Sequence, residues 1–213
     1  MAWPVSGGGS GTALAHNDPD RAKRLAQLNA GLPGPAYRPL SEADARARVD
    51  LFDLAVRGFE VWQSLTGGGK SVRRRDFRPE RFGSLLPHMA LMVFEASPPD
   101  FFYKVFGEDQ AMNVGFDLTG RRMSELVDGN VTDTAAGQAL MTVLRWGRPH
   151  FLELEFTNAN GVGKLAACAM LPLADDAGVE VCEVLSIARF VTVPVDRKRD
   201  PTRGERPPAN GSM

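Results

Sequence analysis

The chain has 213 residues, of which 43% are hydrophobic and 24% are charged, and this suffices for one domain with a core of ordinary size. Its 25 Lys and Arg residues nearly balance its 26 Asp and Glu residues, so no overall positive field attracts nucleic acid or a membrane surface. Apolar runs are shorter than the roughly 18 residues that a membrane span needs, and the N-terminus lacks a signal-peptide pattern, so we expect a cytoplasmic protein.

Both ends of the chain are rich in Gly, Pro and polar residues. Such stretches cannot bury enough apolar surface to offset the conformational entropy that folding removes. We therefore expect a flexible N-terminal segment at residues 1–40, in which 20–28 could form a short helix, and a disordered C-terminal tail at 194–213.

The clearest helix pattern begins at Ser41 and ends before the glycines at 67–69. Ser41 and Asp44 approximate a capping box. The spacing of the apolar residues predicts an amphipathic N-terminal helix within 41–69 that presents one apolar stripe. The stripe needs a surface that covers it, and the sequence allows two such surfaces. One is the same helix of a second subunit, which would make a homodimer, and the other is the sheet of the same chain. The residues of this stripe are Val49, Phe52, Val56, Phe59 and Trp62.

Residues 70–193 predict an α+β order of elements, with strands before and after a group of helices. Two strands should form a hairpin, and three later strands should be joined by turns at Asn160-Gly161 and at 176–178. Cys168 and Cys182 fall on the last two strands, which favours buried thiols over a disulfide. The predicted strands are 88–95, 101–106, 151–156, 165–173 and 181–193, with short helical pieces at 108–127 and a longer helix at 132–146.

Several motifs in this region resemble the stand-alone PAS-domain family of proteobacteria. A tryptophan-bearing helix with Trp62 precedes Asp-Phe-Arg-Pro at 76–79 and Leu-Leu-Pro at 85–87, and Gly-Phe-Asp-Leu-Thr-Gly-Arg follows at 115–121. The resemblance covers about residues 59–190. One motif departs from it, because the family's R-L-x-G-T reads Lys-Val-Phe-Gly-Glu at 104–108.

The resemblance implies a PAS fold at 70–193, with a five-stranded antiparallel sheet and short helices on one face around a small pocket. It also implies a non-enzymatic sensory or protein-interaction module of bacterial signal transduction, which docks onto a partner such as a histidine kinase. The pocket should be apolar and suit a small apolar ligand. We expect it to be lined by Leu91, Val93, Val105, Met112, Leu140, Val143, Leu171 and Leu185.

Two further patterns favour structural roles. Ser-Leu-Thr-Gly-Gly-Gly-Lys-Ser at 64–71 ends like a phosphate-binding loop, but a predicted helix precedes it where that motif needs a strand, so we expect a helix-ending loop. The arginines within 73–81 are partly neutralised by Asp76 and Glu80, which argues against nucleic-acid binding.

The remaining candidates for chemistry are dispersed. His16, His88 and His150 lie far apart, so we expect no metal site, and no haem or flavin motif is present. Glu153 and Glu155 share one face of a predicted strand, which is typical of an exposed face. The alternative function is a small-molecule-binding α+β enzyme that uses a pocket over the curved sheet, but the apolar pocket residues favour the sensory module.

Overall fold

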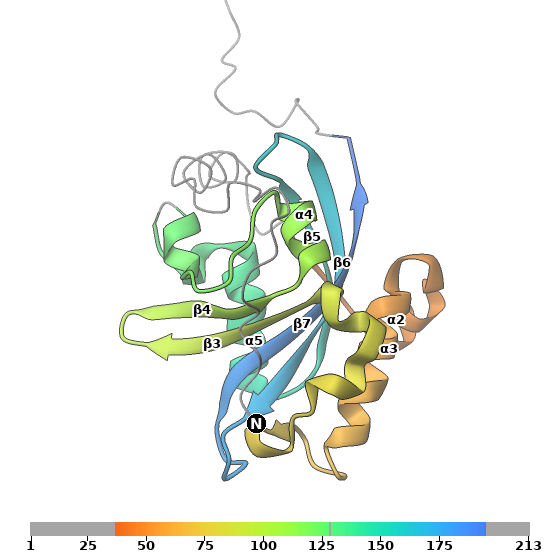
Figure 1. The fold of residues 1–213 in the computed structure, drawn as a ribbon, viewed down its shortest axis with the longest axis vertical. Helices are drawn as coiled ribbons and strands as arrows, with labels where there is room; N and C mark the ends of the chain where they lie inside the picture. The colour runs from red at the N-terminus through yellow and green to blue at the C-terminus, as the bar shows by residue number, and fades with distance from the viewer. Residues whose placement is uncertain (1–36, 128, 195–213) are drawn as a thin grey trace, which may run out of the picture.

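The computed structural model describes residues 37–127 and 129–194 (Figure 1). The segment 1–36, with the helix predicted at 20–28, and the tail from 195 onward lie outside the described residues. The predicted flexible segment at 1–40 overlaps a strand, because β1 (Tyr37–Leu40) pairs antiparallel with β5 at one edge of the sheet.

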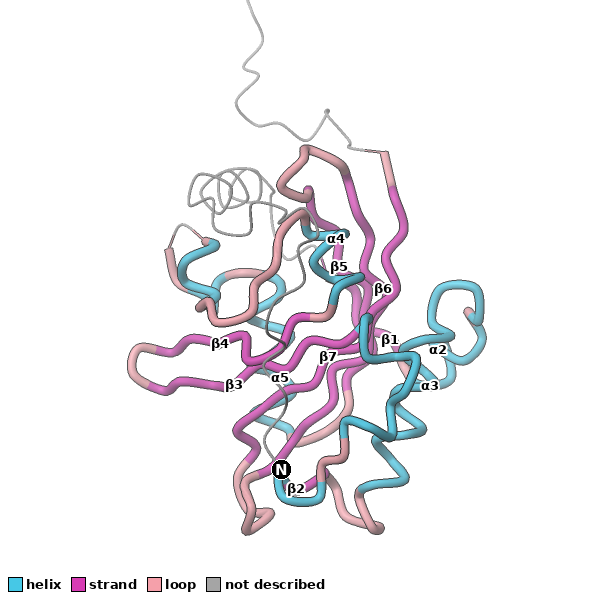
Figure 2. Tube along the Cα trace, viewed as in Figure 1, coloured by secondary structure: helices cyan, strands magenta, loops and turns pink. Residues whose placement is uncertain are grey.

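Five antiparallel strands form most of the sheet, as the sequence predicts (Figure 2). Strands β3 (Met89–Ala96) and β4 (Pro99–Phe106) make the hairpin, and β5 (His150–Thr157), β6 (Gly163–Ala174) and β7 (Val181–Thr192) follow one another. Pairing of β7 with β3 joins the two groups in the order β5-β6-β7-β3-β4.

The sheet has seven strands instead of five. The two additional strands are β1 and β2 (Val72–Arg73), and the sequence predicts neither of them. Strand β2 pairs in parallel with the end of β6. These two strands are only four and two residues long, too short to show a periodic pattern in the sequence.

Helices lie on both sides of the sheet. Between β4 and β5 the chain forms α4 (Glu108–Val114), the short η3 (Met123–Leu126) and η4 (Val131–Asp133), and α5 (Ala135–Trp146). The face of the sheet that α5 covers is called the inner face below. Helices α2 (Glu42–Ala47) and α3 (Val49–Leu65) belong to the opposite, outer face and are drawn in orange on the right of Figure 1.

The helix predicted within 41–69 is therefore two helices. The predicted cap is present, since the Ser41 hydroxyl accepts a hydrogen bond from the Asp44 N–H at 3.1 Å. Arg48, at φ −107° and ψ 57°, breaks the helical backbone between α2 and α3. After α3, the η1 (Arg74–Asp76) and η2 (Pro79–His88) segments lead into β3.

Two hydrophobic clusters fill the two sides of the sheet. Successive strand residues point to opposite faces, so β6 gives Met170 to the inner face and Leu171 to the outer one. The inner cluster includes Ala90, Met92, Phe101, Tyr103, Met123, Leu140, Val143, Leu152, Cys168, Met170 and Val184. The outer cluster includes Phe52, Phe59, Trp62, Leu91, Phe151, Ala167, Ala169, Leu171, Leu173, Leu185 and Ile187.

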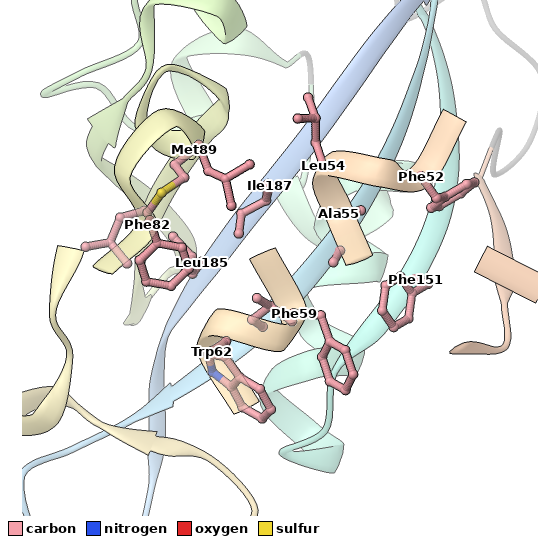
Figure 3. Close-up of a cluster of buried hydrophobic side chains, with 14 of the residues drawn as sticks. Phe52, Leu54, Ala55, Phe59, Trp62, Phe82, Met89, Phe151, Leu185 and Ile187 are labelled. Carbon is pink, nitrogen blue, oxygen red and sulfur yellow. The ribbon is translucent and has the colours of Figure 1, made fainter. Parts of the chain in front are cut away.

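The α3 stripe packs on the sheet of its own chain, which is the second of the two predicted covering surfaces. Phe52, Phe59 and Trp62 are buried among residues of β5, β6 and β7 (Figure 3). Val56 is partly buried and Val49 is 67% exposed. The three aromatic side chains therefore offer no free surface for a homodimer.

Replacing Phe52 by Ala is expected to lower the free energy of unfolding by about 3–5 kcal/mol, because it leaves a cavity under α3. Val49→Ala is the matched control in the same helix and should change stability by less than about 0.5 kcal/mol. Urea denaturation measures both. A Phe52→Ala protein as stable as wild type but with an altered assembly state would contradict the packing.

Candidate functional site

The structure does not bring the eight predicted pocket residues together. Leu140 and Val143 belong to the inner cluster. Leu91, Leu171 and Leu185 are buried in the outer cluster, Val105 packs against it, Val93 is partly buried in β3, and Met112 on α4 is 62% exposed. The prediction is wrong for Leu91, Leu171 and Leu185, which lie on the outer face because neighbouring residues of a strand point to opposite faces.

The inner face is lined by even-numbered positions on β3, β6 and β7 instead. Ala90, Met92, Cys168, Met170 and Val184 belong there to the same hydrophobic cluster as Leu140 and Val143 of α5. Burial raises the pKa of the Cys168 thiol to about 12, so it stays protonated at neutral pH and is a poor nucleophile.

A groove of about 650 Å³ lies on the other side, beside the C-terminal half of α3. The β1–α2 junction, the loop after α3, and the turn from α5 into β5 form its walls. Three aromatic residues, Phe59, Trp62 and Phe151, contribute to the lining. The other lining residues are Leu40, Ser41, Glu42, Gln63, Thr66, Gly68, Gly69, Lys70, Arg148 and Pro149.

The aromatic residues of the groove are held in fixed positions. The Phe59 and Trp62 rings stack with centroids 6.0 Å apart, and Phe151 meets Phe59 edge-on at 5.4 Å. The indole Nε1–H of Trp62 donates to the Pro172 carbonyl oxygen at 3.0 Å, which ties α3 to the end of β6. All three side chains are at most 5% exposed, so they belong to the packed core beneath the groove and present little free surface to it.

The phosphate-loop-like segment at 64–71 is a helix-ending loop, as predicted. Helix α3 ends at Leu65, and Gly67 and Gly68 have φ of 59° and 86°, a left-handed backbone that glycine adopts without strain. The sequence does not predict that this loop contributes to the groove, where Gly68, Gly69 and Lys70 form part of the wall.

Helix α3 is also tied to the sheet by charge. Arg189 on β7 donates from Nε and Nη2 to the two Asp53 carboxylate oxygens, each at 2.7 Å. Two parallel hydrogen bonds fix the relative orientation of the two side chains in addition to attracting them. The pair therefore fixes the position of α3 along β7.

Two strand carboxylates are buried on the outer side instead of exposed. Glu153 is 8% exposed and forms ion pairs with Arg38 and Arg48, so the prediction of an exposed side chain is wrong for it, whereas Glu155 is exposed as predicted. Glu183 is 6% exposed and lies 3.2 Å from Arg74.

The two histidines that the structure describes take part in separate contacts. His88 Nδ1 lies 3.0 Å from the Asp109 carboxylate. Desolvation lowers the pKa of half-buried His150, whose ring meets the edge of Tyr37. No group of three metal-ligating side chains occurs among residues 37–127 and 129–194, and none of the helices there is long and apolar enough to cross a membrane.

Comparison with known proteins gives similarity to solved structures alone. No family model and no curated protein matches the chain. A fungal LOV domain photoreceptor is similar over 51% of this chain and 78% of its own, with 18% identity and a TM-score of 0.36. An RNA-binding Light-Oxygen-Voltage receptor is similar over 81% of this chain and 60% of its own, with 15% identity and a TM-score of 0.36.

LOV domains are a subfamily of PAS domains. At these TM-scores the two similarities carry no argument about the fold or the function of this chain. The structure itself shows five antiparallel strands with α5 and the short helices against their inner face.

The Asp53–Arg189 pair predicts a pH-dependent share of stability. Hydrogen bonds from Arg189 hold the pKa of Asp53 below its ordinary value of 3.8. The pair thus stabilises the fold fully above about pH 4, and its contribution is lost as the pH falls through the lowered pKa. Asp53→Asn should reduce the free energy of unfolding by about 0.5–1 kcal/mol at neutral pH, a small value because both side chains are partly exposed.

The control for this measurement is Asp50→Asn, which removes an exposed carboxylate from the same helix. Urea denaturation at a series of pH values should show the gap between wild type and Asp53→Asn closing below about pH 4. A gap that stays constant in acid would contradict the assigned role of the pair.

Proposed function

We propose that this chain is a PAS-type sensory or protein-interaction module of bacterial signal transduction, acting in the cytoplasm on a signalling partner such as a histidine kinase. The PAS-like layout and the motifs at 76–79, 85–87 and 115–121 support this proposal. Its action requires a route from the inner face of the sheet to an element that a partner can contact.

The observation that carries the proposal is that helices cover both faces of the sheet. Strand β6 places Cys168 and Met170 against the inner cluster, while Leu171 and Leu173 lie in the outer cluster with α3. Because cores are closely packed, a shift of β6 caused on the inner side must be accommodated by α3. The outward side of α3 would then report that shift to a partner.

The chemical character of the inner face favours a binding module over the enzyme alternative. Its strand side chains are mainly apolar, and the Cys168 thiol is held protonated. A small apolar ligand beside Leu140 and Val143 on α5 fits this environment and belongs to the same proposal.

The proposal is tested by adding the purified full chain to purified histidine kinases of the same organism and measuring autophosphorylation. At least one kinase is expected to change its rate several-fold and saturably. If α3 carries the output, Asp53→Asn should alter the response, whereas Asp50→Asn should act like wild type because its carboxylate does not bind Arg189.

The two parts of the proposal fail in different ways. A complete set of kinases that ignores the protein would contradict the kinase assignment. A kinase that responds equally to wild type and to both variants would retain the partner but contradict the route through the Asp53–Arg189 contact.

A further inference from the structure

We propose that the arginine-rich surface formed by residues 73–84 and the adjoining side of α3 binds an acidic segment of a partner protein. Such a contact rests on the proposed function, because it names the chemistry of the partner that α3 would meet. It can nevertheless be measured without a kinase, since a peptide of defined charge is a sufficient probe.

The segment 73–84 belongs to the outermost layer of the molecule. It carries η1 and the first turns of η2, and η2 packs beside α3 over the outer face of the sheet (Figure 1). Phe77 and Phe82 anchor the segment, because their ring centroids lie 5.7 Å apart and both side chains are buried in the outer cluster. The exposed side chains of the segment are therefore carried by a fixed base.

Four arginines on this surface are exposed and form no ion pair within residues 37–127 and 129–194. Arg75, Arg78 and Arg81 belong to the segment. Arg57 on α3 adjoins them, because its Nη2 donates to the Ser84 hydroxyl at 3.2 Å. Arg78 is held in place by its Nη1, which donates to the Arg75 carbonyl oxygen at 2.7 Å. A side chain that is already ordered loses less conformational entropy when a partner binds.

Most carboxylates beside these arginines are already engaged by other cations. Asp76 accepts a hydrogen bond from Arg73 Nε at 2.5 Å, and Asp53 on α3 is held by Arg189. Glu80 is the one carboxylate of the segment that is exposed and forms no ion pair within the described ranges. Four unpaired guanidinium groups against one unpaired carboxylate leave a local surplus of positive charge, although the whole chain has a net charge of -1.

A short acidic peptide fits this surface better than a nucleic acid does. Guanidinium groups bind carboxylates through pairs of N–H donors, and arginine clusters recognise acidic motifs in many complexes. The rings of Phe77 and Phe82 are buried, so neither is free to stack on a base. Asp76 and Glu80 also interrupt the run of positive charge that a continuous phosphate backbone would follow.

Two fluorescent peptides test the charge preference: one alternates Glu with Gly, and the other alternates Gln with Gly. Fluorescence anisotropy with the full-length protein at low ionic strength should show saturable binding of the Glu peptide, at least about fivefold tighter than the Gln peptide. Raising the salt from about 50 to 150 mM should weaken this binding several-fold, because exposed charges are screened.

Two outcomes of the peptide experiment would overturn the proposal. One is the absence of Glu-peptide binding at low salt. The other is a competition in which a uridine oligonucleotide displaces the Glu peptide at a lower concentration than the unlabelled Glu peptide does, which would assign the surface to nucleic acid.

Charge variants place the binding on this surface. Arg75→Gln/Arg81→Gln removes two side chains that make no hydrogen bond within the described ranges, and it should weaken Glu-peptide binding about three- to tenfold. Arg145→Gln/Arg148→Gln is the matched control, because it removes two exposed positive charges at the end of α5, on the inner side of the sheet. Equal weakening by the two double variants would overturn the location.

Glu80→Gln gives a readout that damage to the fold could not produce. Removing the unpaired carboxylate from the surface should tighten Glu-peptide binding about twofold. Unchanged or weaker binding by this variant would contradict the proposal.

The kinase assay separates this surface from the proposed function. A kinase that responds to the wild-type protein should respond less to Arg75→Gln/Arg81→Gln. An undiminished response would overturn this surface as the contact and leave the proposed function intact. Glu-peptide binding without any responding kinase would support the surface and contradict the kinase assignment.

Discussion

The outer face of the sheet must be shielded from water, and this requirement organises the rest of the structure. From Ala166 to Ala174, β6 is buried on both of its faces, so one covering layer is not enough. Helix α5 shields the inner side, and α3 shields the outer side. The outer positions of β6 include Ala167 and Ala169, whose small side chains let a helix approach closely.

The close approach of α3 explains several features that would otherwise be unrelated. Gly58 faces Ile187 of β7 so closely that a Cβ there would overlap the Cδ1 of Ile187. The Asp53–Arg189 pair fixes α3 along the strand, and Trp62 binds the Pro172 carbonyl near its far end. Helix α3 ends at Leu65, and the loop that follows at 67–69 contributes to the wall of the groove.

The sequence predicted most of the elements but not which face each strand residue occupies. Long periodic segments such as α5 and the last three strands were found within a few residues of their ends. The faces are not predictable because β3 and β6 are apolar on both sides: Met92 and Leu91 are both hydrophobic, yet Met92 belongs to the inner cluster and Leu91 to the outer one. Alternation of polar and apolar residues, the usual signal, is absent when both faces are buried.

Sequence patterns also predict neither the long-range charge pairs nor the groove. Arg38 and Glu153 are 115 residues apart, and Asp53 and Arg189 are 136 apart, so only the folded chain brings them together. Lys70 could be noticed in its glycine-rich loop, but nothing near it indicates that Arg148 lies across the same groove.

The seating of α3 on β7 is tested most directly by a double-mutant cycle at Gly58 and Ile187. Ala is a better helix former than Gly by about 1 kcal/mol, yet Gly58→Ala should destabilise the protein by about 1–3 kcal/mol because the added methyl group overlaps Ile187. In the Ile187→Val background, which lacks that terminal methyl, most of this penalty should disappear, giving a coupling energy of at least about 1 kcal/mol. Effects that add to within about 0.5 kcal/mol would show that α3 does not rest on this strand.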